Sequence, residues 1–155
     1  MHTPTPAIDI TTEVPRSCDE VWQIVTTPEG VNAELMPLVR MSFPPTDLTF
    51  TTAPLGQPLF HSWLLLFGFL PFDRHTFVLH ETGPRHFIET SHSLMQKLWR
   101  HERYLSETEN GTLVHDIVTV VPRLGFMSPL TNAVVAFIFR HRHRQIARHY
   151  GADKK

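Results

Sequence analysis

The sequence has a single cysteine, Cys18, and lacks an apolar run long enough for a membrane span. One cysteine excludes an internal disulfide and a thiolate zinc cluster. The longest apolar run, from Trp63 to Phe72, is about half the length that a membrane-spanning helix needs. No basic segment followed by an apolar one opens the chain. We therefore expect no secretory signal, no stable membrane insertion and a cytoplasmic protein.

The chain also lacks an excess of charge of either sign. Its formal net charge is −1, with 19% charged and 41% hydrophobic residues. A nearly neutral balance gives no general attraction to nucleic acids, so we expect no nucleic-acid partner. A chain of 155 residues can bury a substantial core, and we expect residues 1–155 to form a single domain.

Segments of alternating polarity, separated by turn residues, predict a mainly antiparallel sheet. Strands are expected at residues 8–14, 38–43, 59–67, 76–81, 87–93, 99–105 and 112–122. Between the first two strands, Ser17 with Glu20 forms a capping-box pattern that starts a helix burying Val21, Trp22, Ile24 and Val25. Thr27-Pro28 starts a second short helix. Between Leu130 and Tyr150 the sequence has no Gly or Pro to interrupt its apolar pattern. This predicts a long closing helix from Ser128 to Gly151.

The two long strands from Trp99 to Pro122 place ionisable residues among apolar ones. Side chains alternate along a strand, so one face of each strand holds the following residues: Trp99, His101, Arg103 and Leu105 on the first, and Val114, Asp116, Val118 and Val120 on the second. If these faces point inward, His101, Arg103 and Asp116 are either the polar anchors of a ligand pocket or a self-satisfied buried network. The sequence leaves both interpretations open.

Several short motifs occur in a characteristic order along the chain. They are Thr-Pro-Glu-Gly at 27–30, Phe-Gly-Phe-Leu-Pro-Phe-Asp at 67–73, Trp99-x-His101, Gly111-Thr112 followed by Asp116, Pro122-x-x-Gly125, and Phe-Arg-His-Arg at 139–142. Together they resemble the START/SRPBCC superfamily, which includes lipid-transfer domains and polyketide cyclases, and most of all its bacterial members without an assigned activity. The resemblance implies an α+β helix-grip fold, in which about seven antiparallel strands wrap around the long C-terminal helix and leave a cavity.

Under this resemblance, the leading hypothesis is the binding or carriage of a hydrophobic small molecule between the sheet and the last helix. The expected ligand-binding residues are Trp63, Phe67, Trp99, His101, Arg103, Asp116, Val118, Val134, Phe137 and Ile138. The alternative is an enzyme of cyclase or dehydratase type, with His101 and Asp116 as an acid–base pair. The proline-rich segment from Pro44 to Pro58 is expected to border the cavity entrance.

Two further features allow more than one interpretation, and a third excludes a metal site. The late part of the last helix is basic, through Arg140, Arg142, Arg144, Arg148 and three histidines. These cations either complement the helix dipole or make the chain an interaction module. The apolar turn around Phe69, Leu70 and Phe72 is either buried, part of the cavity mouth, or a homodimer contact. His141 and His143 stand two residues apart on a helix and cannot share a metal, and we expect no metal and no cofactor.

Overall fold

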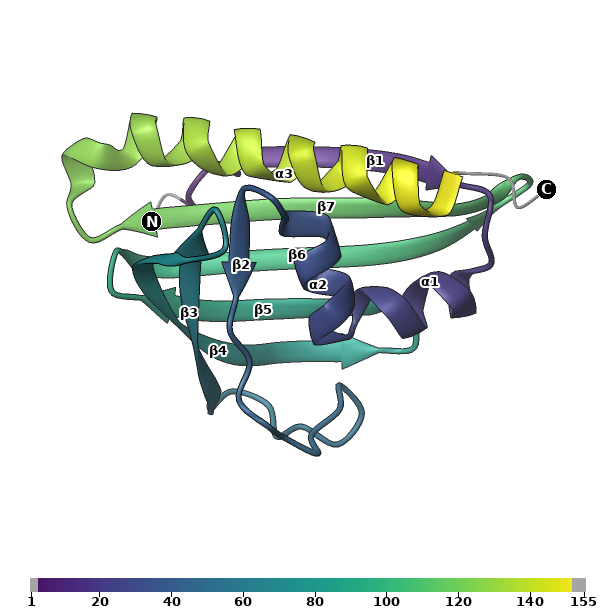
Figure 1. Ribbon diagram of the computed structural model, residues 1–155, viewed down its shortest axis with the longest axis horizontal. Coiled ribbons are helices and arrows are strands. Elements are labelled where there is room, and N and C mark those ends of the chain that lie inside the picture. The colour runs from purple at the N-terminus through teal and green to yellow at the C-terminus, as the bar shows by residue number, and fades with distance from the viewer. Residues whose placement is uncertain (1–2, 152–155) are drawn as a thin grey trace.

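The computed structural model describes residues 3–151, and these form one antiparallel sheet and three α-helices. Within the described residues the sheet has seven strands in the order β1-β7-β6-β5-β4-β3-β2 (Figure 1). The strands are β1 (Ile8–Val14), β2 (Val39–Met41), β3 (Pro58–Leu66), β4 (Leu70–Gly83), β5 (His86–Ser93), β6 (Gln96–Thr108) and β7 (Gly111–Pro122). β7 pairs with β1 in an antiparallel arrangement, so the first and last strands of the chain lie side by side.

The first two helices begin at the caps that the sequence predicts. They are α1 (Cys18–Val25), α2 (Pro28–Leu35) and α3 (Ser128–Gly151), the last preceded by the 3-10 turn η1 (Gly125–Met127). Ser17 and Glu20 form the capping box of α1. Thr27 accepts a hydrogen bond from the Gly30 amide of α2 at 3.0 Å. Each cap satisfies amide groups that the first turn of a helix leaves without partners.

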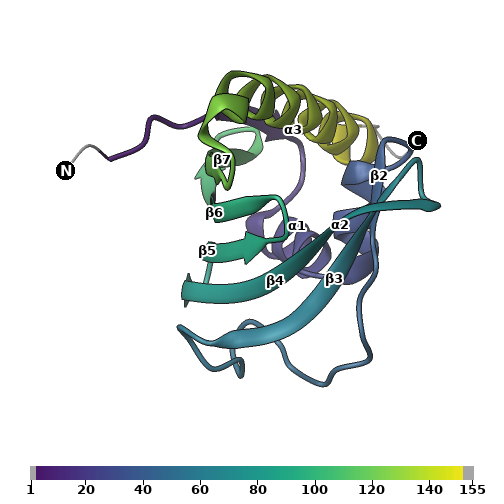
Figure 2. The ribbon, with the colours of Figure 1, turned by 90° about the vertical axis from the view of Figure 1, so that its left-hand side faces the viewer.

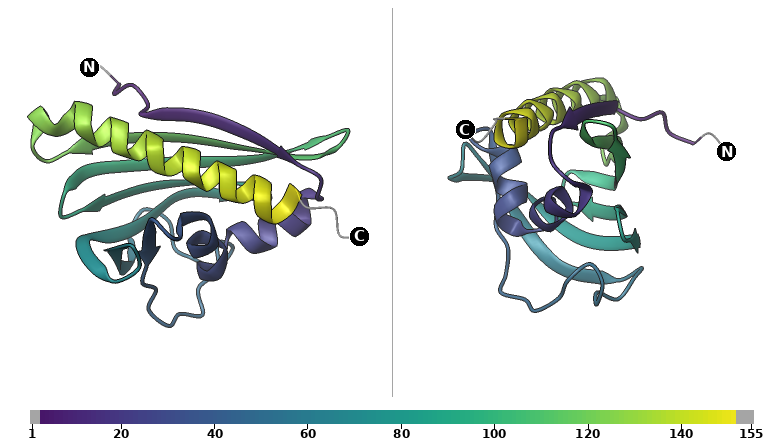
Figure 3. Two further views of the ribbon diagram at one scale, coloured as in Figure 1. Left: turned by 45° about the horizontal axis from the view of Figure 1, so that its top comes forward. Right: turned by 90° about the vertical axis from the view of Figure 1, so that its right-hand side faces the viewer.

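The sheet curls beneath α3, which runs along β1 and β7 (Figure 2). The short helices α1 and α2 lie together, and α2 packs against α3 (Figure 3). This is the helix-grip arrangement, with two short helices between β1 and β2, and it confirms the predicted fold class.

Two apolar clusters hold α3 to the sheet. The first is formed by Val14, Cys18, Val21, Val25, Leu105, Val114, Ile146 and Tyr150, and the second by Ile8, Val118, Val120, Val135, Ala136 and Phe139. The buried positions of α3 recur every three or four residues, which is the spacing of one helix face. Burying these faces supplies most of the hydrophobic free energy that fixes the helix on the sheet.

Some element boundaries and burial predictions differ from the structure. β4 begins at Leu70 rather than 76, because Leu70 and Pro71 still pair with Leu66 and Leu65 of β3 beyond a bulge. Ile24, predicted to be buried, is 45% exposed. Val21 and Val25 stand four residues apart and take the inner face of α1, so Ile24 falls on the outer side.

Candidate functional site

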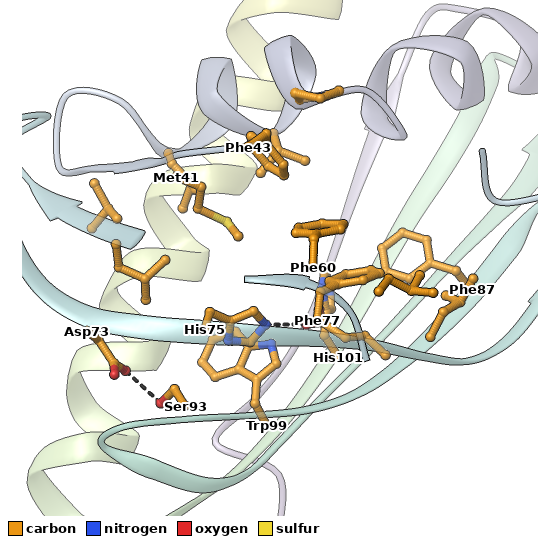
Figure 4. Close-up of a pocket in the computed structure, with 18 of the residues that line it drawn as sticks. Met41, Phe43, Phe60, Asp73, His75, Phe77, Phe87, Ser93, Trp99 and His101 are labelled. Atoms are coloured by element: carbon orange, nitrogen blue, oxygen red, sulfur yellow. Dashed lines mark hydrogen bonds and ion pairs between the residues drawn. The ribbon is translucent and has the colours of Figure 1, made fainter. Parts of the chain in front are cut away.

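A cavity of about 620 Å³ lies between the inner face of the sheet, the short helices, the first half of α3 and the segment between β2 and β3 (Figure 4). Most of its lining is apolar. The larger apolar side chains are Trp22, Leu35, Met41, Phe43, Leu48, Phe50, Leu59, Phe60, Leu64, Phe72, Phe77, Leu79, Phe87, Met95, Trp99, Met127, Leu130, Val134, Ile138 and Phe139. The volume lies within the range of about 300–1,000 Å³ that small-molecule sites occupy.

Stacked aromatic rings form part of the pocket wall. Phe60 of β3 stacks on Phe77 of β4, with ring centroids 5.0 Å apart. Phe50 belongs to the irregular segment between β2 and β3 and stacks on Phe87 of β5, also at 5.0 Å. The proline-rich segment therefore contributes directly to the pocket wall, and Pro44, Thr46 and Leu48 also line the pocket.

Polar side chains gather on one part of this lining, where β4, β5 and β6 lie next to one another. They are Asp73, His75, Glu89, Ser93, Gln96 and His101, which we call the polar floor. His75 Nε2 lies 2.5 Å from Glu89 Oε2, and the Ser91 hydroxyl donates to the same oxygen at 2.6 Å. The indole of Trp99 packs edge-on against the His75 ring, as Figure 4 shows.

Asp73 is held in place by three donors at one end of the polar floor. The Ser93 hydroxyl donates to Oδ2 at 2.7 Å (Figure 4). The backbone amides of Arg74 and Met95 donate to Oδ1 at 2.8 and 3.2 Å. A carboxyl that accepts from three donors has the hydrogen-bonding pattern of its ionised form.

A second buried polar cluster lies behind the pocket and joins α2, β6, β7 and α3. Arg103 donates to both oxygens of Glu34, at 2.8 and 3.0 Å, and to both oxygens of Asp116, at 2.7 and 2.6 Å. Arg142 donates to Glu34 Oε2 through two nitrogens. His101 and His143 each place Nε2 2.9 Å from an Asp116 oxygen. Two arginines thus face two carboxylates, and the fixed charges of this buried network cancel.

The protonation states of this network follow from burial and its ion pairs. Burial by itself raises the pKa of Glu34 and of Asp116, but the adjacent Arg103 holds both below their ordinary values. Burial lowers the pKa of His101 despite the opposing charge of Asp116, so the imidazole is neutral at pH 7. Since Asp116 is ionised and only accepts, His101 Nε2 carries the proton and donates it to Oδ1.

Four of the predicted ligand-binding residues line the pocket: Trp99, His101, Val134 and Ile138. Arg103, Asp116 and Val118 also point inward, as strand alternation predicts, and are fully buried. They do not line the pocket. Every oxygen of Asp116 is occupied by Arg103 or a histidine, and Val118 packs in the second apolar cluster. Contacts from α2 and α3 enclose these three residues and separate them from the pocket.

Trp63, Phe67 and Phe137, also expected to bind the ligand, lie outside the pocket lining. Trp63 is 46% exposed and contacts Arg74 on the outer face of the sheet. Its neighbour Leu64 takes the inner face of β3 and lines the pocket. Phe137 is exposed because Ala136 and Phe139 occupy the side of α3 that faces the sheet.

The basic end of the last helix is not a uniformly solvated surface. Arg142 and His143 are buried and belong to the network with Glu34 and Asp116. His141 Nε2 donates to the Met36 carbonyl oxygen at 2.9 Å, because a carbonyl oxygen can only accept. Arg142 and His143 are therefore not exposed to a partner, which contradicts an interaction module that uses the whole basic stretch.

The sequence-based search did not select His75, Glu89 or Asp73, although all three line the pocket. A signal was present in the alternation of the two strands. Asp73, His75, Phe77 and Leu79 share one face of β4, and Phe87, Glu89, Ser91 and Ser93 share one face of β5. Both faces mix polar and apolar residues, as the inner faces of β6 and β7 do. The pairing of β4 with β5 then brings the polar members together.

The model of the family described as "Domain of unknown function (DUF8410)" matches residues 12–150 of the sequence. The chain belongs to this family. No curated protein matches it in sequence. Among the described residues, no helix has both the length and the apolar composition needed to cross a membrane.

Solved structures of the same fold share little sequence with this DUF8410 chain. Protein CV1439 from Chromobacterium violaceum has a TM-score of 0.74 at 13% identity, and the match covers 97% of this chain and 100% of that one. A START superfamily protein from Mycobacterium smegmatis has a TM-score of 0.68 at 11% identity, with 93% and 96% covered. DynU16, a putative protein in the dynemicin biosynthetic locus, has a TM-score of 0.56 at 16% identity, with 92% of this chain and 48% of that chain covered. The fold is therefore START/SRPBCC-like, as the sequence motifs predict.

Proposed function

We propose that this protein binds or carries a hydrophobic small molecule in the pocket between the sheet and α3. The observation that carries the proposal is the pocket itself, a mainly apolar cavity of about 620 Å³ whose walls are stacked aromatic rings. A dry core would fill such a space with side chains, because protein interiors are close-packed. The free thiol of buried Cys18 fits a reducing cytoplasmic setting.

The proposal is tested with N-phenyl-1-naphthylamine, a neutral apolar dye that becomes fluorescent when it leaves water. The purified protein should bind the dye, and native mass spectrometry of the same preparation should show a co-purified apolar molecule that the dye displaces. Absence of saturable dye binding would overturn the proposal.

Two tryptophan substitutions on α3 locate the binding site. Val134 lines the pocket and Ala133 does not, although both side chains are exposed at neighbouring positions of one helix. Val134→Trp should weaken dye binding at least tenfold because the indole enters the pocket mouth. Ala133→Trp should leave the affinity unchanged. Equal affinities of the two variants would place the dye elsewhere.

An enzyme of cyclase or dehydratase type is the second candidate, supported by the hydrogen-bonded pair of His75 and Glu89 inside the pocket. His101 also lines the pocket, but Asp116 is enclosed by four hydrogen bonds and does not reach it. Catalysis predicts that a co-purified ligand changes mass on incubation with fresh protein and that His75→Ala prevents the change. Carriage predicts a constant ligand mass with both proteins.

A further inference from the structure

The charges around the pocket are unevenly distributed, and the imbalance bears on which end of a ligand enters it. Arg142 lines the pocket, but its guanidinium donates twice to Glu34 and lies 4.7 Å from the centre of the Phe139 ring. Arg103 is fully buried between Glu34 and Asp116. Each guanidinium is thus matched by a carboxylate, and neither offers an uncompensated positive charge to a ligand.

The polar floor has the opposite balance. It holds two carboxyl groups, Asp73 and Glu89, and one histidine, His75, within hydrogen-bond distance of Glu89. Burial raises the pKa of Glu89, but His75 overcomes this effect and holds it below its ordinary value. The remaining floor histidine, His101, is neutral at pH 7. Whichever form His75 takes, it supplies at most one positive charge against two carboxylates.

Acceptor atoms without a donor remain on this floor. Within residues 3–151 no hydrogen bond reaches Oε1 of Glu89, since His75 and Ser91 both contact Oε2. Oε1 of Gln96, which also lines the pocket, is buried and has no hydrogen-bond partner among the described residues. Gln96 Oε1 has almost no accessible surface, so Glu89 Oε1 is the acceptor that a ligand donor in the pocket can reach.

We propose that the pocket selects apolar molecules whose buried end carries a hydrogen-bond donor, a hydroxyl or an ammonium group, and discriminates against carboxylates. Glu89 Oε1 is the acceptor in this arrangement, and the aromatic walls hold the apolar body. A ligand carboxylate on this floor would meet like charges at low dielectric, and among the described residues that line the pocket the one arginine, Arg142, is already paired with Glu34. This inference rests on the proposed function, because it assigns the polarity of the ligand for the same pocket.

The test measures displacement of N-phenyl-1-naphthylamine at pH 7.5 by 1-decanol, decylamine and decanoate, which share one chain and differ in the end group. Decanol and decylamine should displace the dye at concentrations at least tenfold lower than decanoate. Equal potency of the three compounds, or stronger displacement by decanoate, would overturn the inference while leaving the proposed function intact. Failure of the protein to bind the dye at all would instead overturn the proposed function.

Substitutions in the polar floor, compared with a surface control, test whether the floor causes the selectivity. Glu89→Gln removes one charge at nearly constant shape and should reduce the preference for decylamine over decanoate at least tenfold. The matched control is Glu81→Gln, because Glu81 is an exposed residue of β4 that pairs with His86 outside the pocket, and it should keep the full preference. Asp73→Asn removes the other carboxylate of the floor and should also reduce the preference for decylamine over decanoate, so it replaces Glu89→Gln in the test if that variant does not fold. An unchanged preference in a folded Glu89→Gln protein would overturn the assignment.

Discussion

At Asp116, four nitrogen atoms converge on two carboxylate oxygens. Two belong to Arg103, one to His101 and one to His143, and the Asp116 side chain is fully buried. The resulting network fixes the positions of β6, β7 and α3 relative to one another. It also positions the His101 ring, which is the member of the network that reaches the pocket together with Arg142.

Asp116→Asn should lower the free energy of unfolding by about 3–5 kcal/mol, because it leaves the charge of Arg103 buried beside a neutral amide. Urea denaturation monitored by circular dichroism measures the loss. Asp9→Asn is the control, since Asp9 pairs with His115 at the surface, and its effect should stay below about 1 kcal/mol. A loss below about 1 kcal/mol at Asp116 would contradict the role given to the network.

Stability should also fall as the pH decreases. The folded-state pKa of His101 is below its ordinary value of 6.5, so the unfolded chain binds a proton first and stability declines as the pH falls below 6.5. Glu34 and Asp116 have pKa values below their ordinary 4.5 and 3.8, and their contribution is present above these values and is lost below them. Urea titrations at pH 7.5, 5.5 and 4 should show two successive decreases. His101→Gln should remove the first decrease selectively, and an unchanged first step would show that another histidine causes it.

At the scale of elements, the hairpin between β6 and β7 depends on a close backbone approach at Gly111. A Cβ atom at this position would lie 2.1 Å from the Val14 carbonyl oxygen, and its φ is +150°. Gly111→Ala should therefore cost about 1–3 kcal/mol of stability. Gly125→Ala is the control, because no atom lies within 4 Å of a Cβ built there. Thermal denaturation of both variants checks the prediction, and equal melting temperatures would contradict it.

The segment between β2 and β3 is the element that we expect to respond to a ligand. It has no regular strand or helix between Pro44 and Gln57, yet Phe50 packs on Phe87 and Leu48 lines the pocket. Hydrogen–deuterium exchange should be faster in this segment than in β5 and β6, and N-phenyl-1-naphthylamine should slow it. Full protection without ligand would contradict a mobile pocket wall.

At the scale of the whole molecule, one apolar surface lies around the turn between β3 and β4. Phe67, Phe69 and Leu70 are each more than half exposed there. Exposed apolar patches commonly mark contacts with other proteins, so a homodimer through this turn stays a prediction. Light scattering coupled to size exclusion should give twice the mass of the 17.9 kDa chain, and Phe69→Ser should shift it toward the monomer. A wild-type protein that is monomeric at high concentration would exclude this contact.

The sequence by itself determined the local structure and the inward faces of the long strands. Helix caps depend on residues three apart and strand faces on alternation, so Ser17, Thr27 and the face of His101 and Arg103 were predictable from neighbours in the chain. The motifs extended this to the helix-grip fold. Which inward residues meet a ligand was decided only by tertiary structure.

Contacts between residues far apart in the sequence determine which inward residues line the pocket. Glu34 of α2 and Arg142 of α3 are 108 positions apart, and their approach closes the network around Arg103 and Asp116. Pairing of β4 with β5 brings His75 to Glu89 and forms the polar floor from residues that the sequence analysis did not select. Strand periodicity gives the direction of a side chain, but whether it ends in an ion pair or in a cavity depends on which distant element packs over it.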